Sequence, residues 1–234
     1  MICDLTIRQA TENDIEFILE AIVESEKSSS NVISSCNVFG LTEEKFKDII
    51  RKVLREDVPD YDYYLTGFII AEKDGEYIGA LGSWVEEGDG TPSGIIKATI
   101  LFPYLDKEKM REISKNTRVV KGLTIGREPH TLQLEHGYTR EPYRRQGVFT
   151  RLIKENILRN VKAHNAIEKV QGALFKANFK SYNAHIKLGF DVAEEKHVDD
   201  PEIFKFFPFD TKVLMELNKD KISGLESDSE KGLL

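Results

Sequence analysis

The chain has few of the features that mark secreted, membrane-spanning or metal-binding proteins. Only two of its 234 residues are cysteine, Cys3 and Cys36, and their spacing fits no metal-ligand pattern. No apolar run approaches the roughly 18 residues that a bilayer-spanning helix needs. The N-terminus lacks the basic-then-apolar pattern of a signal peptide. These absences predict a cytoplasmic protein with reduced thiols and no membrane segment.

Positive charge is in deficit, and common catalytic signatures are missing. The formal net charge of −7 argues against nucleic acid as a partner. The five histidines are scattered, without a His-Glu-x-x-His motif, so we expect no metal site. There is no Walker-type Gly-Lys-Ser/Thr loop either. An acidic protein with one local basic turn fits a small anionic ligand better.

Size and composition predict a soluble globular protein with a substantial core. The hydrophobic fraction is 40% and the charged fraction is 31%. We expect a single domain over residues 1–221, interrupted by an insertion around residues 86–128. That insertion could cover a substrate or form a dimer surface. The sequence of residues 222–234 predicts a disordered tail.

The most informative stretch spans residues 132–163. Leu132 and Leu134 alternate with polar residues as in a strand, and the pattern breaks at Gly137. A basic turn over residues 140–146 follows. The pattern then changes to the spacing of one buried helix face, carried by Phe149, Ile153, Ile157 and Val161. This is a strand, a tight basic loop and a helix.

The entrance of that helix is suited to an anion. A helix N-terminus presents unpaired backbone N–H groups and a partial positive charge, which favour phosphate. Arg144 and Arg145 add charge-assisted donors in the same turn, and Gly147 stands at the helix entrance. The pattern therefore indicates an oxyanion or phosphate site.

Other segments predict strands, helices and two aromatic loops. Asp74-Gly75 between residues 68–71 and 77–85 is a strong hairpin signal. Thr11 and Asp14 form a capping-box-like helix start, and residues 32–40 are expected to form a polar loop. Further strands are expected at residues 5–9, 169–175, 190–198 and 211–217, and helices at 43–55 and 178–187. A tyrosine-rich loop (residues 58–64) could line a pocket or cover the sheet edge. A phenylalanine-rich loop (residues 199–209) could close a site, contact a partner or fill the core.

The basic turn resembles a known motif. Arg144-Arg145-Gln146-Gly147-Val148-Phe149 is similar to the Arg/Gln-x-x-Gly-x-Gly/Ala pyrophosphate loop of the GNAT superfamily of acyl-CoA-dependent N-acyltransferases. Arg144 and Gly147 fall on the first two fixed positions, whereas Phe149 replaces the usual small residue. Residues 5–14, 68–85 and 178–190 resemble other GNAT segments in the family's order, so the likeness covers most of the chain.

The resemblance implies a fold and a reaction. The fold would be α/β (α+β), in α-β-α layers, around a central mixed, mostly antiparallel sheet of about seven strands. This sheet would splay between the fourth and fifth strands. The reaction would transfer acetyl from acetyl-CoA, without a metal, to a small amine or a protein amine by direct attack in a ternary complex. A homodimer is one expected assembly.

The resemblance also assigns residues to the coenzyme. The backbone of Tyr138 and Thr139, at a bulge in the fourth strand, would face the pantetheine and the thioester carbonyl. Asn178 matches the family's coenzyme-contacting asparagine, although it could equally cap a helix. The remaining coenzyme contacts would come from the turn and helix start: Arg144, Arg145, Gln146, Gly147, Val148, Phe149 and Thr150.

Catalytic roles are assigned with alternatives. Glu135 is the candidate general base, directly or through water, or else a solvated strand-end carboxylate. His136 is the second choice, and alternation places it on the opposite face. His185 stands where the family has the tyrosine that protonates the leaving thiolate, so it could be the general acid. Tyr182, one turn earlier, could substitute, or His185 could have no role.

Two other functions compete with acyl transfer. Phe149 and His185 depart from the family pattern, which would suit a non-catalytic sensor or scaffold that keeps the CoA-binding fold. The third hypothesis is a protein that binds a phosphate ligand and is unrelated to acyl transfer.

Overall fold

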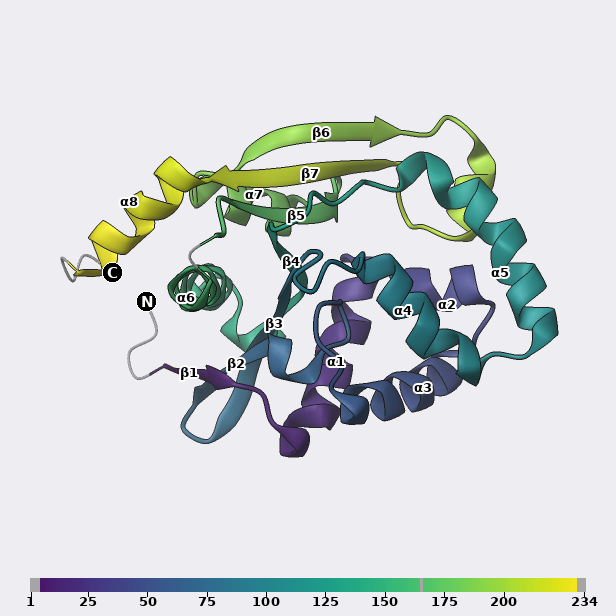
Figure 1. Cartoon of the computed structure of the whole chain (residues 1–234), viewed down its shortest axis with the longest axis horizontal. Coiled ribbons are helices and arrows are strands. Elements are labelled where there is room, and N and C mark those ends of the chain that lie inside the picture. The colour runs from purple at the N-terminus through teal and green to yellow at the C-terminus, as the bar shows by residue number, and fades with distance from the viewer. Residues whose placement is uncertain (1–4, 165, 231–234) are drawn as a thin grey trace.

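A single seven-stranded sheet runs through the molecule (Figure 1). The structure, a computed structural model, describes residues 5–164 and 166–230. The strand order is β1-β2-β3-β4-β5-β7-β6, and every neighbouring pair is antiparallel except β4 and β5. The strands are β1 (Thr6–Gln9), β2 (Phe68–Lys73), β3 (Glu76–Val85), β4 (Leu132–Thr139), β5 (Lys169–Phe175), β6 (Asp191–His197) and β7 (Thr211–Asn218).

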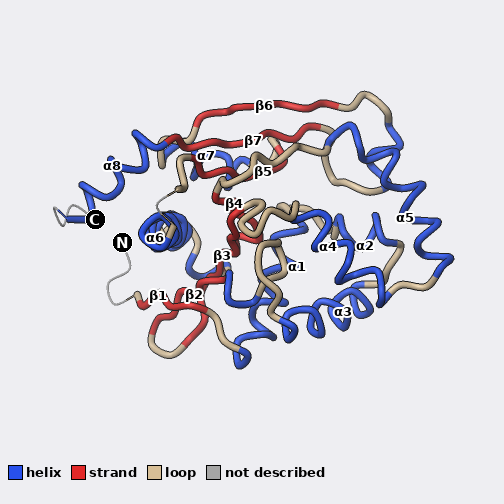
Figure 2. The backbone as a smooth tube through the Cα atoms, viewed as in Figure 1, coloured by secondary structure: helices blue, strands red, loops and turns tan. Residues whose placement is uncertain are grey.

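Helices cover both faces of the sheet. The first group, which lies to one side of β3 and β4 in Figure 1, comprises α1 (Ile15–Lys27), α2 (Ser34–Phe39), α3 (Glu43–Glu56), α4 (Ser93–Leu101) and α5 (Lys107–Val120). The second group comprises α6 (Val148–Ala163), α7 (Phe179–Lys187) and α8 (Lys219–Glu230). Figure 2 shows β3 and β4, in red, between α6 and the first group of helices. The expected α-β-α layering and mixed seven-stranded sheet are confirmed.

Each face of the sheet has its own hydrophobic core. On the α1 face, α1 and α3 bury their apolar sides together with Phe68, Ile70 and Ala80 of the sheet. On the α6 face, α6 packs against the alternate residues, among them Ile69 and Leu81. The alternation of β2 and β3 thus supplies both cores. A smaller third cluster joins Phe175 at the end of β5 to α5 and the phenylalanine-rich loop.

Local sequence signals explain several boundaries. The Thr11–Asp14 capping box is present at the start of the first helical segment. Asp74 and Gly75 adopt positive φ angles of 52° and 80° in the β2–β3 turn, as a two-residue hairpin requires. Gly147 is the N-cap of α6 with φ of 86°, a conformation that disfavours other residues.

Two segments differ from their expected structure. The chain from residue 222 was expected to be a disordered tail, but α8 is helical through Glu230, and Ile222 is buried with Leu225 packed beside it in the α6-face core. Residues 231–234 lie outside the described residues. Residues 34–39 form α2 rather than a loop, because this short helix buries Cys36 and packs against α5. Burial raises the pKa of the Cys36 thiol to about 11, and Cys3 is outside the described residues.

Candidate active site

The site is built where β4 and β5 separate. These parallel strands pair only at Leu132 with Val170 and at Gln133 with Gln171. Beyond Gln133 they diverge toward their C-terminal ends, so the expected splay between the fourth and fifth strands is present. Diverging strands leave backbone groups and side chains on their inner edges without a strand partner, which makes the split a place for a ligand.

A bulge in β4 changes which side chains face the site. The register between β3 and β4 shifts between Ala80 and Gly82, and His136 takes a positive φ of 54°. Strict alternation predicts Glu135 and His136 on opposite faces, and that prediction is wrong. The extra residue turns both side chains toward the α1 face, where both line one pocket.

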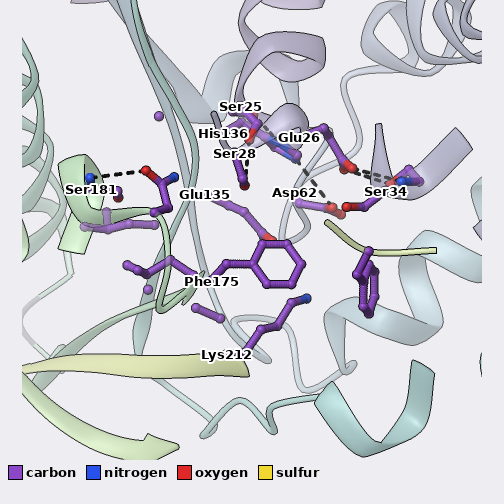
Figure 3. Close-up of a pocket in the computed structure, with 18 of the residues that line it drawn as sticks. Ser25, Glu26, Ser28, Ser34, Asp62, Glu135, His136, Phe175, Ser181 and Lys212 are labelled. Carbon is purple, nitrogen blue, oxygen red and sulfur yellow. Dashed lines mark hydrogen bonds and ion pairs between the residues drawn. The ribbon is translucent and has the colours of Figure 1, made fainter. Parts of the chain in front are cut away.

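This pocket, of about 310 Å³, passes through the split from one face of the sheet to the other. Figure 3 shows Glu135 near its centre, with His136 and Ser25 on one side and Phe175 and Lys212 below. The wall on the α1 face, here called the polar wall, comprises Ser25, Glu26, Ser28, Ser34, Ser35, Val38, Phe39, Asp62, Lys97, Val120, Glu135, His136, Phe175, Phe207 and Lys212. The wall on the α6 face, here called the apolar wall, comprises Leu81, Leu134, Gly137, Phe149, Gly172, Leu174, Asn178, Ser181 and His185.

Two carboxylates of the polar wall are held by identified donors. Arg127 donates to Glu135 at 2.8 Å, and its guanidinium lies over the Trp84 ring at 4.9 Å. The backbone N–H of Ser35 donates to Glu26 at 2.9 Å, and the Ser35 hydroxyl donates at 2.7 Å. Charge-assisted hydrogen bonds of this kind fix a carboxylate in one orientation.

A third carboxylate, Asp62, is buried in an ion pair. Lys97 donates to it at 2.5 Å, and His136 Nε2 lies 3.6 Å away. Burial alone would raise the pKa of Asp62, but Lys97 and His136 together lower it below its usual range. Burial likewise opposes the charge of Lys97, and Asp62 nevertheless raises the pKa of that ammonium. The pair therefore stays ionised at neutral pH.

His136 joins this ion pair to the open pocket. Its ring is stacked between Tyr63 and Phe68, with centroid distances of 5.4 and 6.2 Å. Its Nδ1 lies 3.2 Å from the Ser25 hydroxyl. Tyr63 is thus a core side chain, and the tyrosine-rich loop supplies the site through Asp62 rather than through its rings.

Phe149 shapes the apolar wall. A Cβ atom on Gly137 would lie 2.4 Å from the Phe149 ring, so the absence of a side chain at Gly137 lets this ring approach β4. The ring also meets His185 edge-on at a centroid distance of 6.0 Å. Phe149 therefore narrows the split at the position where the motif usually has a small residue.

His185 does not fit the expected role of general acid. It is buried, and its Nδ1 lies 2.8 Å from the carbonyl oxygen of Ser181, which can only accept a hydrogen bond. Burial lowers the pKa of His185, although the Ser181 carbonyl opposes that shift. The ring is therefore neutral at neutral pH with its proton on Nδ1, and Nε2, close to Gly172, has none to donate.

Asn178 lines the pocket, whereas Tyr182 does not. Tyr182 packs against the α6-face core and is not among the pocket-lining residues, so it is not brought to the site as a substitute acid. Asn178 does line the pocket, and its side chain also accepts from the Ser181 N–H at 3.5 Å as the N-cap of α7. The capping role is therefore present beside any contact with a ligand.

The basic turn lies exposed at the start of α6. Arg144 Nε donates to the Thr139 carbonyl at 2.9 Å, and Gln146 donates to the Pro142 carbonyl at 2.8 Å. Arg145 has a positive φ of 63°. No side chain caps the first turn of α6, so the N–H groups of this turn remain available to an anion. Val148 is buried in the core, and Thr150 is half-buried.

Tyr138 and Thr139 pair with β3 through Ala80 and Gly79. The Tyr138 side chain points to α1 and donates to Glu20 at 3.0 Å, so only its backbone can face the split. The bulge expected near these residues is confirmed, and it lies just before them at His136 and Gly137.

Reasoning from the sequence missed several residues of the polar wall. Asp62 comes from the tyrosine-rich loop, Lys97 from the insertion around residues 86–128 and Lys212 from the start of β7, while Arg127 of the same insertion is outside the lining and donates to Glu135. The insertion thus contributes residues to the pocket lining. In the phenylalanine-rich loop, Phe207 lines the pocket and also packs in the third cluster, so two of its three proposed roles coincide.

Solved acetyltransferases share this architecture. An N-acetyltransferase from Staphylococcus aureus Mu50 matches with a TM-score of 0.60 at 15% identity, over 91% of this chain and 100% of that chain. The aminoglycoside acetyltransferase AAC(6')-Ib, solved with coenzyme A and kanamycin, matches with a TM-score of 0.52 at 14% identity, over 94% and 98%. An acetyltransferase of the GNAT family from Streptococcus pneumoniae gives 0.52 at 15% identity, over 92% and 99%.

This chain has the GNAT fold. The fold predicted from the resemblance is therefore confirmed, and the split between β4 and β5 is the split of that fold. No protein-family model matches the chain, and no curated protein matches it in sequence.

Two further observations concern the described residues. None of their helices combines the length and apolar character required to cross a bilayer. Within the same residues, no three His, Cys, Asp or Glu side chains are grouped so as to hold a metal ion.

Proposed function

We propose that the protein is an acyl-CoA-dependent N-acyltransferase that moves an acetyl group from acetyl-CoA to a primary amine. The observation that carries this proposal is the pocket that passes through the β4–β5 split with Glu135 near its centre. A donor can enter such a pocket from the α6 face and an acceptor from the α1 face, so that the two meet without a covalent enzyme intermediate.

The α6 face suits the donor. The uncapped first turn of α6 and the exposed Arg144 and Arg145 provide donors for a diphosphate. The apolar wall between Leu134 and Gly172 suits a pantetheine chain, and Asn178 and Ser181 supply polar groups along it. Phe149 narrows the split beside this wall, and Ser181 and His185 line the same pocket as Phe149.

The polar wall suits an amine. An ammonium ion must lose its proton before its nitrogen can attack the thioester carbonyl. Glu135 is our proposed base, acting directly or through a water molecule, because its carboxylate stands in the pocket and Arg127 orients it. His136 is the alternative. Its nitrogens face Ser25 and Asp62, so a proton would reach it through the Ser25 hydroxyl.

The transfer then proceeds in one encounter of two substrates. The amine nitrogen forms a bond to the acetyl carbon and releases its second proton to the base or to water, the carbon–sulfur bond breaks, and the CoA sulfur leaves as a thiolate that takes up a proton from water. In this proposal, backbone N–H groups on the inner edge of β4 beside the bulge would stabilise the oxyanion. No protein group needs to protonate the thiolate, because a thiol with a pKa near ~8.5 exchanges readily with water.

Two measurements test the proposal. Thermal unfolding with CoA or acetyl-CoA reports donor binding, and we expect stabilisation that increases with ligand concentration. Release of free thiol from acetyl-CoA with a panel of primary amines reports transfer. Stabilisation without thiol release for any amine would favour a non-catalytic CoA sensor, for which Phe149 in the split is the supporting observation. No stabilisation by either coenzyme would reject both functions.

A further inference from the structure

The polar wall contains one cation without a counter-ion. Lys97 and Arg127 each pair with a carboxylate, Asp62 and Glu135 respectively. For Lys212 the described residues provide no ion pair and no side-chain hydrogen bond. Its ammonium instead lies over the rings of Phe175 and Phe207, at 4.8 and 4.5 Å from their centroids. These rings hold the charge at the pocket through cation–π contacts.

Lys212 belongs to the face opposite the proposed coenzyme site. It pairs in register with Phe175 of β5, whose ring packs in the third cluster on the α1 face. The next residue, Val213, points to the opposite face and packs in the α6-face core. The Lys212 ammonium therefore does not face the start of α6, and the phosphates of CoA are not its expected partners.

The surroundings of Lys212 favour a ligand anion. Burial lowers the pKa of this ammonium, while Glu135 and Glu26 across the pocket oppose that shift and Arg127 and Lys97 add to it. Both carboxylates already have donors, from Arg127 and from Ser35. An anion brought by a ligand would restore the interaction that Lys212 loses with water.

We propose that the acceptor carries a carboxylate in addition to its amine, and that Lys212 binds this carboxylate. This inference rests on the proposed function and names its substrate class, a free amino acid with an apolar side chain. Glu26 and Glu135 would receive the ammonium end, and the buried Ser34 hydroxyl, which has no partner among the described residues, would add a hydrogen bond. Phe39, Phe175 and Phe207 suit an apolar side chain.

The test compares acceptors that differ only in the anion. We expect phenylalanine to be acetylated with a kcat/KM about tenfold or more above that of phenethylamine, since hydrogen bonds to charged groups have this magnitude. Phosphoethanolamine against ethanolamine tests a phosphate instead. Preference for phosphate alone, or equal use of phenylalanine and phenethylamine, would overturn the carboxylate assignment and leave acyl transfer intact.

Variants locate the effect. Lys212→Met should reduce the phenylalanine-to-phenethylamine ratio of kcat/KM by about 10- to 100-fold, and Lys212→Arg should retain most of it. Lys205→Met is the matched control, because Lys205 is exposed beside Glu202 and outside the pocket. An unchanged ratio in Lys212→Met would reject the inference.

A binding assay separates this inference from the proposed function. Calorimetric titration with phenylalanine, in the absence of acetyl-CoA, should show binding that Lys212→Met weakens and Lys205→Met leaves unchanged. If such binding occurs while CoA neither binds nor releases thiol, the acyltransferase function fails and the carboxylate site stands. If thiol release occurs but phenylalanine does not bind, the carboxylate site fails alone.

Discussion

The two walls of the pocket are built on opposite physical principles. The polar wall collects carboxylates and cations from α1, α4, β4, β7 and the loop of Asp62, and most of these charges are compensated by a partner. The apolar wall consists of aliphatic, glycine and phenylalanine residues, with His185 as the ionisable side chain among its described residues. A buried charge costs free energy unless it is paired, whereas an apolar wall needs only close packing.

This difference indicates where specificity resides. Under the proposed function, an apolar channel with a polar helix end would hold the invariant donor of an acyl transfer without distinguishing between acceptors. Paired charges around one unpaired lysine can distinguish acceptors by their charge. Variants in the polar wall should therefore affect stability and turnover, and variants on the coenzyme side should affect affinity for CoA.

Removal of the Lys97 ammonium should give the largest effect. Lys97→Met leaves Asp62, which is only 6% exposed at its side chain, as an unpaired carboxylate. We expect a loss of about 3 kcal/mol in the free energy of unfolding, near the lower end for a broken buried pair, because Lys97 itself keeps some exposure. Urea unfolding measures it, and the double variant with Asp62→Asn should recover much of the loss.

The pH dependence of that loss has a definite sign. The folded-state pKa of Asp62 is lowered, so the stability contributed by the pair is present above the ordinary aspartate pKa and is lost as pH falls toward the folded value. The difference between wild type and Lys97→Met should therefore be greatest at neutral pH and decrease toward acid pH, beginning as the pH falls through the pKa of the unpaired Asp62, which burial raises. Lys205→Met breaks an exposed ion pair with Glu202 and should lower the free energy of unfolding by less than about 0.5 kcal/mol at any pH.

Glu135→Gln should reduce turnover rather than stability. Loss of a general base lowers kcat by about 10²- to 10⁴-fold, and we expect the lower end because His136 remains nearby. CoA binding, followed by thermal shift, should be unchanged. Glu128→Gln, on an exposed carboxylate paired with Lys169, is the control. If His136→Asn abolishes turnover while Glu135→Gln leaves it intact, the base is His136.

Arg144→Ala should change affinity for the donor only. We expect the dissociation constant for CoA to rise by about tenfold, with kcat at saturating acetyl-CoA retained. Binding of pantetheine, which lacks the diphosphate, should not change. Arg118→Ala removes an equally exposed arginine of α5 and serves as control. A similar loss with pantetheine would show that the turn does not hold the diphosphate.

The sequence predicts features that depend on local chemistry. The Asp74-Gly75 turn, the Thr11–Asp14 capping box and the glycine at the start of α6 were all predicted and are present. The helical structure of residues 222–230 was not predicted, because the buried contacts of Ile222 depend on α6, which is distant in sequence. Local propensity gives no information about such a contact.

The polar wall could be predicted only in part. Glu135 stands next to a strand end that the sequence pattern identifies. The left-handed backbone conformation of His136 could not be predicted, because such a conformation usually occurs at glycine, and strict alternation therefore assigned His136 to the wrong face. Asp62, Lys97 and Lys212 come from three separate segments, and each resembles an ordinary surface charge in the sequence. Only the assembled sheet shows that they share one cavity.

Substitution of His185 should give the smallest effect on kcat of these variants. It tests whether a residue of the apolar wall takes part in the chemistry. His185→Asn keeps a donor for the Ser181 carbonyl and removes Nε2. Because the pKa of His185 is lowered by burial, the ring is neutral at neutral pH and Nε2 has no proton for the thiolate. We therefore expect kcat to change by less than about threefold, far below the effect of losing a general acid.

Stability and pH profiles complete this last test. The substitution should cost about 1 kcal/mol, the scale of one buried hydrogen bond, as measured by urea unfolding. The pH profile of kcat should keep its shape in His185→Asn, because no proton transfer of the reaction passes through this ring. Loss of the alkaline limb together with a drop of about 10²-fold in kcat would instead assign the acid to His185 and place chemistry on the apolar wall as well.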